Sequence, residues 1–155
     1  MKLGIDPGAH GAFCFLADNG KIVDIVDMPT IEVKVGNSMR DRVSASLVTA
    51  AIKPYKNHVS LAILEKVGGL TGQSASAAFT FGYSCGIVEG VLSALEIPVS
   101  LVSPQVWKKT YGLGKDKGLA RQMASRLWPE SAEFFKRIKD DGRAEAALIA
   151  KWENK

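Results

Sequence analysis

Four carboxylates stand where apolar segments of the chain end or pack. Asp6 closes the apolar opening segment and is followed at once by Pro7-Gly8, and Glu65 closes a continuous apolar run at positions 59 to 64. A carboxylate at the end of a buried strand is costly unless a cation meets it. Asp141 and Glu145 are four residues apart, so on a helix they share one face.

The face that carries these two acids is also the packing face of the last helix. Leu148, Ile149 and Trp152 follow Glu145 at intervals of three, four and seven residues and extend the same stripe. The acids must therefore point toward a sheet or toward the rim where its strands end. Asp140 lies about 100° round the helix, which suits a helix cap or an alternate metal ligand.

Carboxylates that meet at one rim would repel one another when ionised, and divalent cations would relieve the repulsion. Oxygen ligands without His or Cys favour Mg²⁺ or Mn²⁺. Two such ions about 4 Å apart are typical of in-line phosphodiester hydrolysis, one activating water and the other stabilising the leaving oxygen. Each acid alone has an ordinary explanation: a turn at Asp6, a solvated strand end at Glu65, a helix cap at Asp141. Together they favour a metal site.

The hydrophobic pattern predicts an α/β fold that positions these acids. An antiparallel meander of three strands is followed by alternating helices and strands and then by C-terminal helices. The expected strands are 2–6, 11–17, 22–28, 59–64 and 98–102, and the expected helices are 41–53, 74–95, 106–111, 117–128 and 141 to the end. This order predicts one mixed five-stranded sheet with helices on both faces. We expect residues 1–155 to form a single domain.

Composition narrows the class of protein and of partner. The chain has 46% hydrophobic and 23% charged residues, which is typical of a globular domain. Its net charge of +4 favours an anionic partner, with nucleic acid ahead of others. Cys14 and Cys85 are expected to be reduced and buried. No basic leader and no apolar run of bilayer-spanning length is evident, so we expect a cytoplasmic protein without a membrane partner.

A basic segment follows the last expected strand. Between Pro104 and Arg126 six basic residues accompany one acidic residue, a net charge of +5, and Trp107 and Tyr111 are interleaved. We assign Trp107 to the core and the cations to contacts with DNA phosphates. An ordinary solvated helix face is the alternative. The expected DNA-binding residues, with two further cations beside the acids, are Lys66, Lys108, Lys109, Lys115, Lys117, Arg121 and Arg143.

Several segments of the chain resemble the RuvC-type Holliday junction resolvases of the ribonuclease H-like superfamily, particularly the small phage-encoded members. They are Gly4-Ile-Asp-Pro-Gly8, Leu64-Glu-Lys66, Phe81-Gly-Tyr through Gly90-Val-Leu, Pro98 through Trp107-Lys-Lys, and Asp141-Gly-Arg-Ala-Glu-Ala-Ala-Leu-Ile-Ala150. The resemblance covers almost the whole chain and implies a ribonuclease H-like fold. It also implies a Mg²⁺-dependent endonuclease that nicks opposing strands of four-way DNA junctions, as a homodimer joined through the helix at 74–95.

The same resemblance assigns the catalytic and metal-binding set to Asp6, Glu65, Asp141 and Glu145. The bacterial pattern has two aspartates three residues apart on the last helix, whereas Gly142 stands three residues before Glu145. The third ligand is therefore either Asp141 or Asp140. Glu in place of Asp also lengthens the fourth ligand by one methylene.

Three other functions remain open from the sequence. One is a binder of branched DNA that does not cleave it, and another is a related nuclease that acts on other branched DNA or on RNA. A third takes Asp6-Pro-Gly8 as the phosphate loop of an actin-like or sugar-kinase ATPase. Those ATPases need two lobes around the nucleotide, and 155 residues provide one.

Overall fold

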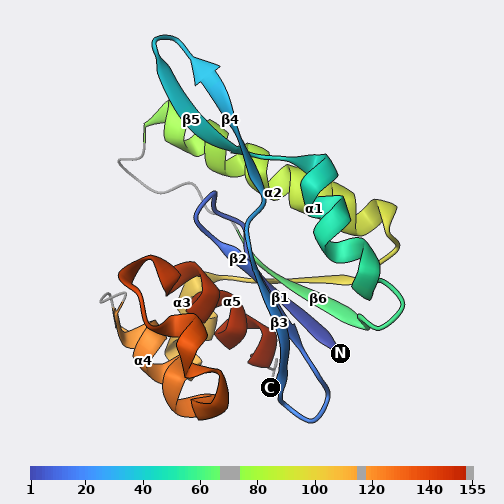
Figure 1. Cartoon of the computed structure of the whole chain (residues 1–155), viewed down its shortest axis with the longest axis vertical. Coiled ribbons are helices and arrows are strands. Elements are labelled where there is room, and N and C mark those ends of the chain that lie inside the picture. The colour runs from blue at the N-terminus through green and yellow to red at the C-terminus, as the bar shows by residue number, and fades with distance from the viewer. Residues whose placement is uncertain (67–73, 115–117, 153–155) are drawn as a thin grey trace.

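A mixed five-stranded sheet forms the centre of the computed structural model, which describes residues 1–66, 74–114 and 118–152 (Figure 1). The strand order is β3-β2-β1-β6-β7. The first three strands pair antiparallel, while β6 and β7 continue parallel to β1. The strands are β1 (Lys2–Asp6), β2 (Ala12–Leu16), β3 (Ile22–Asp27), β6 (Leu61–Glu65) and β7 (Val99–Val102). The predicted α/β class and mixed five-stranded sheet are confirmed.

Helices cover both faces of this sheet, as predicted. In Figure 1, α1 and α2 lie above the sheet and α3, α4 and α5 lie below it. The helices are α1 (Ala45–Ile52), α2 (Ala75–Ala94), α3 (Pro104–Thr110), α4 (Gly118–Leu127) and α5 (Asp141–Lys151), with short 3₁₀ segments η1 (Lys53–Tyr55), η2 (Pro129–Phe135) and η3 (Ile138–Asp140). Ser74 begins α2 by accepting a hydrogen bond from the Ala77 amide at 3.2 Å.

The alternation of side chains along a strand divides the core into two layers. On the side of α1 and α2, β1 and β2 bury the large residues Leu3, Ile5, Phe13 and Phe15. On the side of α5 the same strands present smaller side chains, including Ala12 and Cys14. These small side chains leave room for α5 to lie close to the sheet.

Gly4 marks the closest approach of α5 to the sheet. A Cβ atom added to Gly4 would lie 2.1 Å from the carbonyl oxygen of Ala146, so α5 packs its backbone directly on β1. The alanine-rich middle of α5 permits this, since Ala144, Ala146 and Ala147 are fully buried. Burial nearly all round the helix fixes its position on the sheet, and with it the positions of its two acids.

The helix expected at 41–53 was placed too early, because its first residues belong to a hairpin. Strands β4 (Thr30–Val35) and β5 (Ser38–Val43) form a separate two-stranded sheet that projects from the body (Figure 1). Gly36 takes a φ of +61° in the turn between them. Helical spacing at Val43 and Leu47 suggested a single helix, whereas the period-two alternation of Ile31, Val33 and Val35 was the stronger signal.

Helix α2 corrects the expectation that no segment reaches bilayer-spanning length. Within the described part of the chain, it is the one helix whose length and composition would suffice to cross a membrane, with a mean hydropathy of 1.2. Only 28% of that window is buried inside the molecule. Its apolar character comes largely from small residues, Ala, Gly and Ser, interspersed with larger ones, so no continuous run of large apolar side chains marks it in the sequence.

Candidate active site

Two of the predicted acids lie side by side at one edge of the sheet. Strands β1 and β6 are parallel neighbours, and Ile5 pairs with Leu64. The next residue on each strand is the acid, Asp6 on β1 and Glu65 on β6. The carboxyl ends of parallel strands are a common location for ligand sites. The convergence expected from the sequence is therefore present for these two carboxylates.

Glu145 joins this pair from α5. Burial, then the negative charges of Glu145 and Glu65, raise the pKa of Asp6 to about 7, although the Gly8 amide donates to its Oδ1 at 3.2 Å. Burial also raises the pKa of Glu65, with Glu145 adding to the effect. The charge of Glu145 thus opposes the ionisation of both Asp6 and Glu65, which is the electrostatic condition that a bound cation relieves.

Each of three acids is held by a donor from α3 or α4. The Trp107 indole Nε1 donates to Glu65 Oε1 at 2.8 Å, and Lys108 Nζ lies 3.0 Å from Glu145 Oε1. Arg121 Nε donates to Asp141 Oδ1 at 2.7 Å. Nowhere in the described ranges do three His, Cys, Asp or Glu side chains lie close enough together to hold a metal ion as they stand. The oxygen-only donor set nevertheless fits Mg²⁺ or Mn²⁺ by its chemistry.

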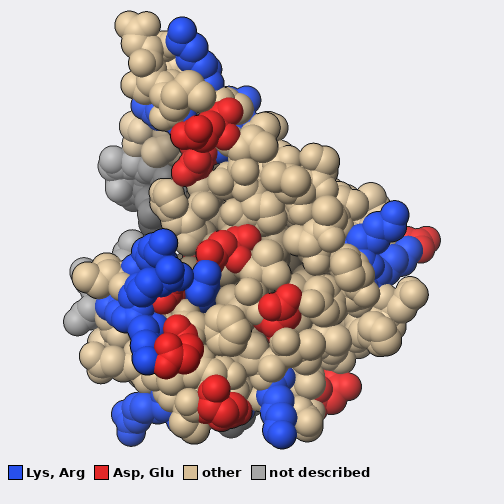
Figure 2. All heavy atoms as spheres, viewed as in Figure 1, with Lys and Arg blue, Asp and Glu red and all other residues tan. Residues whose placement is uncertain are grey.

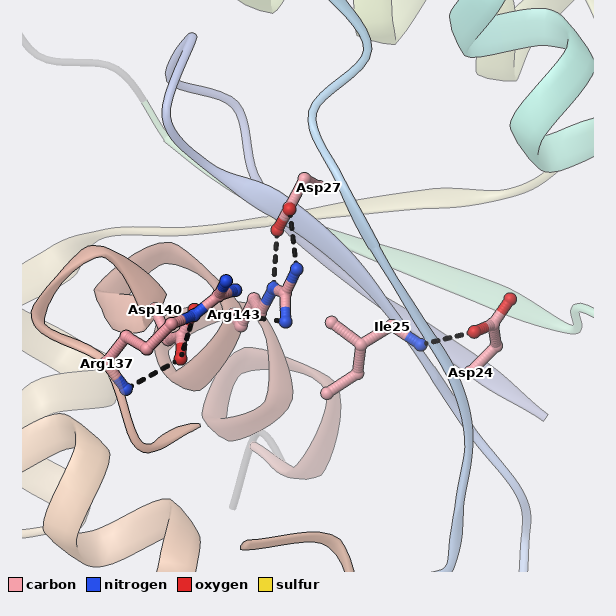
Figure 3. A network of polar contacts seen from close by, with 6 residues as sticks. All are labelled: Asp24, Ile25, Asp27, Arg137, Asp140 and Arg143. Atoms are coloured by element: carbon pink, nitrogen blue, oxygen red, sulfur yellow. Dashed lines mark hydrogen bonds and ion pairs between the residues drawn. The ribbon is translucent and has the colours of Figure 1, made fainter. Parts of the chain in front are cut away.

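Asp140 and Asp141 have different surroundings although they are adjacent. Asp140 is 1% exposed and accepts hydrogen bonds from the backbone amide and the guanidinium of Arg137 (Figure 3). Burial raises the pKa of Asp140, but these bonds outweigh it and hold the pKa below its usual value. The Asp141 side chain is 25% exposed at the start of α5. Asp140 therefore has the role of a local cap, while Asp141 faces a single cation.

Arg143 ties the start of α5 to the end of β3. Its guanidinium forms two bonds to the Asp27 carboxylate, at 2.5 and 2.6 Å, and lies 3.8 Å from Asp140 (Figure 3). The Arg143 side chain is 19% exposed, against 64% for Asp27. Arg143 is one of the cations predicted to contact DNA, and in the structure its donors form bonds inside the molecule.

Gly142 accounts for the departure from the bacterial acid pattern. A Cβ atom at this position would lie 2.4 Å from the carbonyl oxygen of His10 and 2.8 Å from the Cα of Gly11. Real side chains do not tolerate such contacts with backbone atoms, so no acid fits three residues before Glu145 in this packing. The turn between β1 and β2 thereby excludes the usual third-ligand position.

A cleft of about 660 Å³ opens beside the acids. The β4–β5 hairpin contributes Thr30 and Asp41 to the lining, and the segment before α5 contributes Arg137 and Lys139. Most other charged lining residues are acids: Asp6, Asp27, Asp140, Asp141 and Glu145. Figure 2 shows basic side chains gathered on the body next to acidic ones, below the projecting hairpin. The run Lys136-Arg-Ile-Lys139, directly before the two aspartates, is the sequence signal for the two cations in this lining.

The predicted DNA-binding cations fall into three groups. Lys66 and Lys109 are exposed. Lys108, Arg121 and Arg143 pair with acids. Lys115 and Lys117 lie outside the described residues. The charge of the basic segment is thus partly neutralised within the molecule, since Lys108 pairs with Glu145 and Arg121 with Asp141.

Comparison with known proteins gives two kinds of match. No protein-family model matches the chain. The chloroplastic Holliday junction resolvase MOC1 of Chlamydomonas reinhardtii is 36% identical over 87 residues, which cover 54% of this chain. They cover only 10% of MOC1, so the chain corresponds to a small part of that relative.

Solved structures match over nearly the whole chain. T. thermophilus RuvC in complex with a Holliday junction substrate has a TM-score of 0.63 at 15% identity, covering 96% of this chain and 89% of that one. A further Thermus thermophilus RuvC structure has a TM-score of 0.54 at 15% identity, covering 96% of this chain and 90% of that one. The ribonuclease H-like fold predicted from the sequence is confirmed, since the chain shares the fold of these RuvC structures.

Proposed function

We propose that the chain is a structure-selective DNA endonuclease that resolves four-way junctions by hydrolysis dependent on Mg²⁺ or Mn²⁺, as in DNA recombination and repair. The observation that carries this proposal is the electrostatic coupling of Asp6, Glu65 and Glu145 where β1 and β6 end, beside a cleft whose charged lining residues are mainly acids. The relatives support it, since one is a Holliday junction resolvase and RuvC was solved with a junction substrate.

Asp6, Glu65, Asp141 and Glu145 are the proposed metal ligands. We choose Asp141 over Asp140 because Arg137 already satisfies the buried Asp140 carboxylate. When bound, two divalent ions would supply an activated water and stabilise the leaving oxygen. The pairs made by Lys108 and Arg121 must open to admit the ions, and both cations are partly exposed, at 33% and 21%. Released cations would then be free to meet DNA phosphates.

Phosphate contacts are proposed on both sides of the acids. Lys66 and Lys109 are exposed near the ends of β6 and α3, and Arg137 and Lys139 line the cleft. Lys115 and Lys117 remain predictions from the sequence. A substrate of this kind assigns the chain to a compartment that contains DNA, either the cytoplasm expected from the sequence or an organelle.

A homodimer is the proposed assembly, because two opposing nicks require two active sites. The outer face of α2 is the proposed contact surface for the second copy of the chain. Gly82 and Gly86, four residues apart, are exposed, and no atom of the described residues lies within 4 Å of an added Cβ, so another helix can approach closely. Phe79 is 68% exposed on the same helix. A partner subunit, rather than a lipid bilayer, would then cover this apolar helix.

Replacing Gly86 with glutamate should convert the dimer into a monomer, because a long charged side chain would enter the close helix contact. Sedimentation velocity at micromolar concentration measures the change. Circular dichroism should remain that of the wild type, since the position faces open space. A wild-type protein that sediments as a monomer at these concentrations would contradict the proposed assembly.

The function is tested by comparing a labelled four-way junction with a linear duplex of the same sequences. With Mg²⁺ we expect paired nicks in the junction and little cleavage of the duplex, and EDTA should abolish the nicks. A binder that does not cleave would instead retain tight junction binding with no product at any metal concentration. Matched junctions of RNA separate the related ribonuclease, which would cleave them in preference to DNA.

A further inference from the structure

Trp107 connects the protein core to one of the proposed metal ligands. Its ring is fully buried in the layer between the sheet and α5, as the sequence analysis expected for a core residue. Its indole Nε1 nevertheless donates to Glu65 Oε1 at 2.8 Å, and Glu65 is only 8% exposed. The Trp107 side chain therefore belongs to the core and also contacts the Glu65 carboxylate.

We infer that Trp107 is a positioning residue that fixes the Glu65 carboxylate for metal binding, an inference that rests on the proposed nuclease function. Glutamate has three rotatable bonds, and holding it in one conformation costs up to about 2 kcal/mol of side-chain entropy. A hydrogen bond from a ring that is itself immobilised offsets part of that cost before any ion arrives. Outer partners of this kind commonly orient metal-binding carboxylates.

The chemistry of the indole suits this role. It has one N–H donor and no acceptor, so it binds one lone pair of Oε1 and leaves Oε2 and the second Oε1 lone pair to coordinate an ion. It is also uncharged, so it orients the carboxylate without competing with a cation for the site.

The neighbouring residue on α3 has a different role. Lys108 Nζ bonds Glu145 at 3.0 Å with a side chain that is 33% exposed, so it can leave when an ion binds. Trp107 is buried and cannot leave. Two consecutive residues of α3 therefore contact acids. Trp107 holds Glu65 of β6 permanently, whereas Lys108 can leave Glu145 of α5 when an ion binds. Only the permanent contact can set the geometry of the loaded site.

Trp107→Phe keeps the buried ring and removes the N–H donor, and Trp128→Phe is its matched control. Trp128 is 2% exposed, and its Nε1 donates at 2.8 Å to the carbonyl oxygen of Gly20, a backbone acceptor. By isothermal titration calorimetry, we expect Trp107→Phe to weaken Mn²⁺ binding about 10-fold or more, the range for outer partners of metal ligands. Trp128→Phe should leave the Mn²⁺ affinity at the wild-type value. Equal Mn²⁺ affinities for the two variants would overturn the inference.

Kinetics add a readout that loss of stability alone would not move. For Trp107→Phe, the Mn²⁺ concentration that gives half-maximal junction cleavage should rise by the same factor as the dissociation constant, while the rate at saturating Mn²⁺ returns close to wild type. Thermal unfolding without metal should shift to lower temperature in both variants, because each loses one indole hydrogen bond, buried for Trp107 and partly buried for Trp128. A wild type that neither binds Mn²⁺ nor cleaves junctions would refute the nuclease itself, which distinguishes the two failures.

Indole NMR tests the contact in the wild-type protein, should Trp107→Phe fail to fold. The chain has three tryptophans, so Trp128→Phe and Trp152→Phe assign the indole N–H signal of Trp107 by elimination. Titration with Mg²⁺ should shift this signal and leave that of Trp128 in place. Calorimetry shows when the protein is saturated with Mg²⁺. If the Trp107 signal has not moved at saturation, the inference is overturned.

Discussion

Gly142→Ala is expected to reduce junction cleavage by about 10²-fold, because a displacement of catalytic groups by about 1 Å is sufficient for such a loss. The added methyl would lie 2.4 Å from the His10 carbonyl oxygen and 2.8 Å from the Gly11 Cα, both backbone atoms that cannot rotate away. The start of α5 would have to move off the β1–β2 turn. That end of the helix carries Asp141, with Glu145 one turn further along.

Stability should fall together with cleavage. Overpacking of a buried contact typically costs about 1 to 3 kcal/mol, and urea unfolding measures the loss. Gly114→Ala is the matched control, since among the described residues an added Cβ there meets only the end of the Leu119 side chain, at 4.0 Å. Wild-type cleavage and stability in Gly142→Ala would contradict the packing described for α5.

The same contact predicts that the bacterial pattern cannot be restored. Gly142→Asp, combined with Asp141→Asn, would place an acid three residues before Glu145 but would create the same clash with the β1–β2 turn. We expect the double variant to be at least as impaired as Gly142→Ala. Recovery of cleavage in the double variant would show that the third ligand belongs at position 142.

The sequence predicted the location of the acids better than their partners. Asp6 and Glu65 each end an apolar strand, and period-two patterning places strand ends without knowledge of the tertiary structure. The pairs of Lys108 with Glu145 and of Arg121 with Asp141 span 37 and 20 residues. The local pattern of the sequence carries no information on contacts between such distant residues, so it predicts only DNA contacts for these two cations.

Two further features depended on tertiary packing. The β4–β5 hairpin projects from the body, so its strands lack the pattern of buried apolar residues that identifies a core strand. The helical spacing that begins at Val43 therefore predicts a helix that starts too early, inside β5. Gly142 was noticed as a departure from the family pattern, but its cause is the approach of the β1–β2 turn, which no spacing along the chain reveals. Sequence patterning thus identified the strand ends, while contacts between elements decide which acids can serve as ligands.

Asp6→Asn should have opposite effects on activity and on metal-free stability. Removing a metal ligand forfeits several kcal/mol of transition-state stabilisation, so cleavage should fall by more than about 10²-fold. Junction binding without metal should persist, because the basic residues are unchanged. Asp18→Asn is the control, since the Asp18 side chain is 85% exposed and pairs with the N-terminal amine, at the end of β1 opposite to Asp6.

The stability effect follows from the pKa of Asp6, which burial and the neighbouring acids raise from 3.8 to about 7. Between these values the folded protein retains a proton that the unfolded chain releases, so metal-free stability of the wild type should fall as the pH rises from 4 to 7. Asparagine has no charge to bury. The variant should therefore match the wild type near pH 4 and exceed it at pH 8 in EDTA, by roughly 1 to 3 kcal/mol.

Divalent metal should reverse this order at pH 8, because an ion that binds only the folded state stabilises the wild type in proportion to its affinity. Urea unfolding of both proteins, in EDTA and then in Mn²⁺, measures the reversal. A wild type that is the more stable protein at pH 8 in EDTA would refute the mutual repulsion of Asp6, Glu65 and Glu145. The fold thus places three acids where β1 and β6 end and α5 begins, and their repulsion lowers the stability of the metal-free protein. The metal ion that the proposed reaction requires would remove this repulsion.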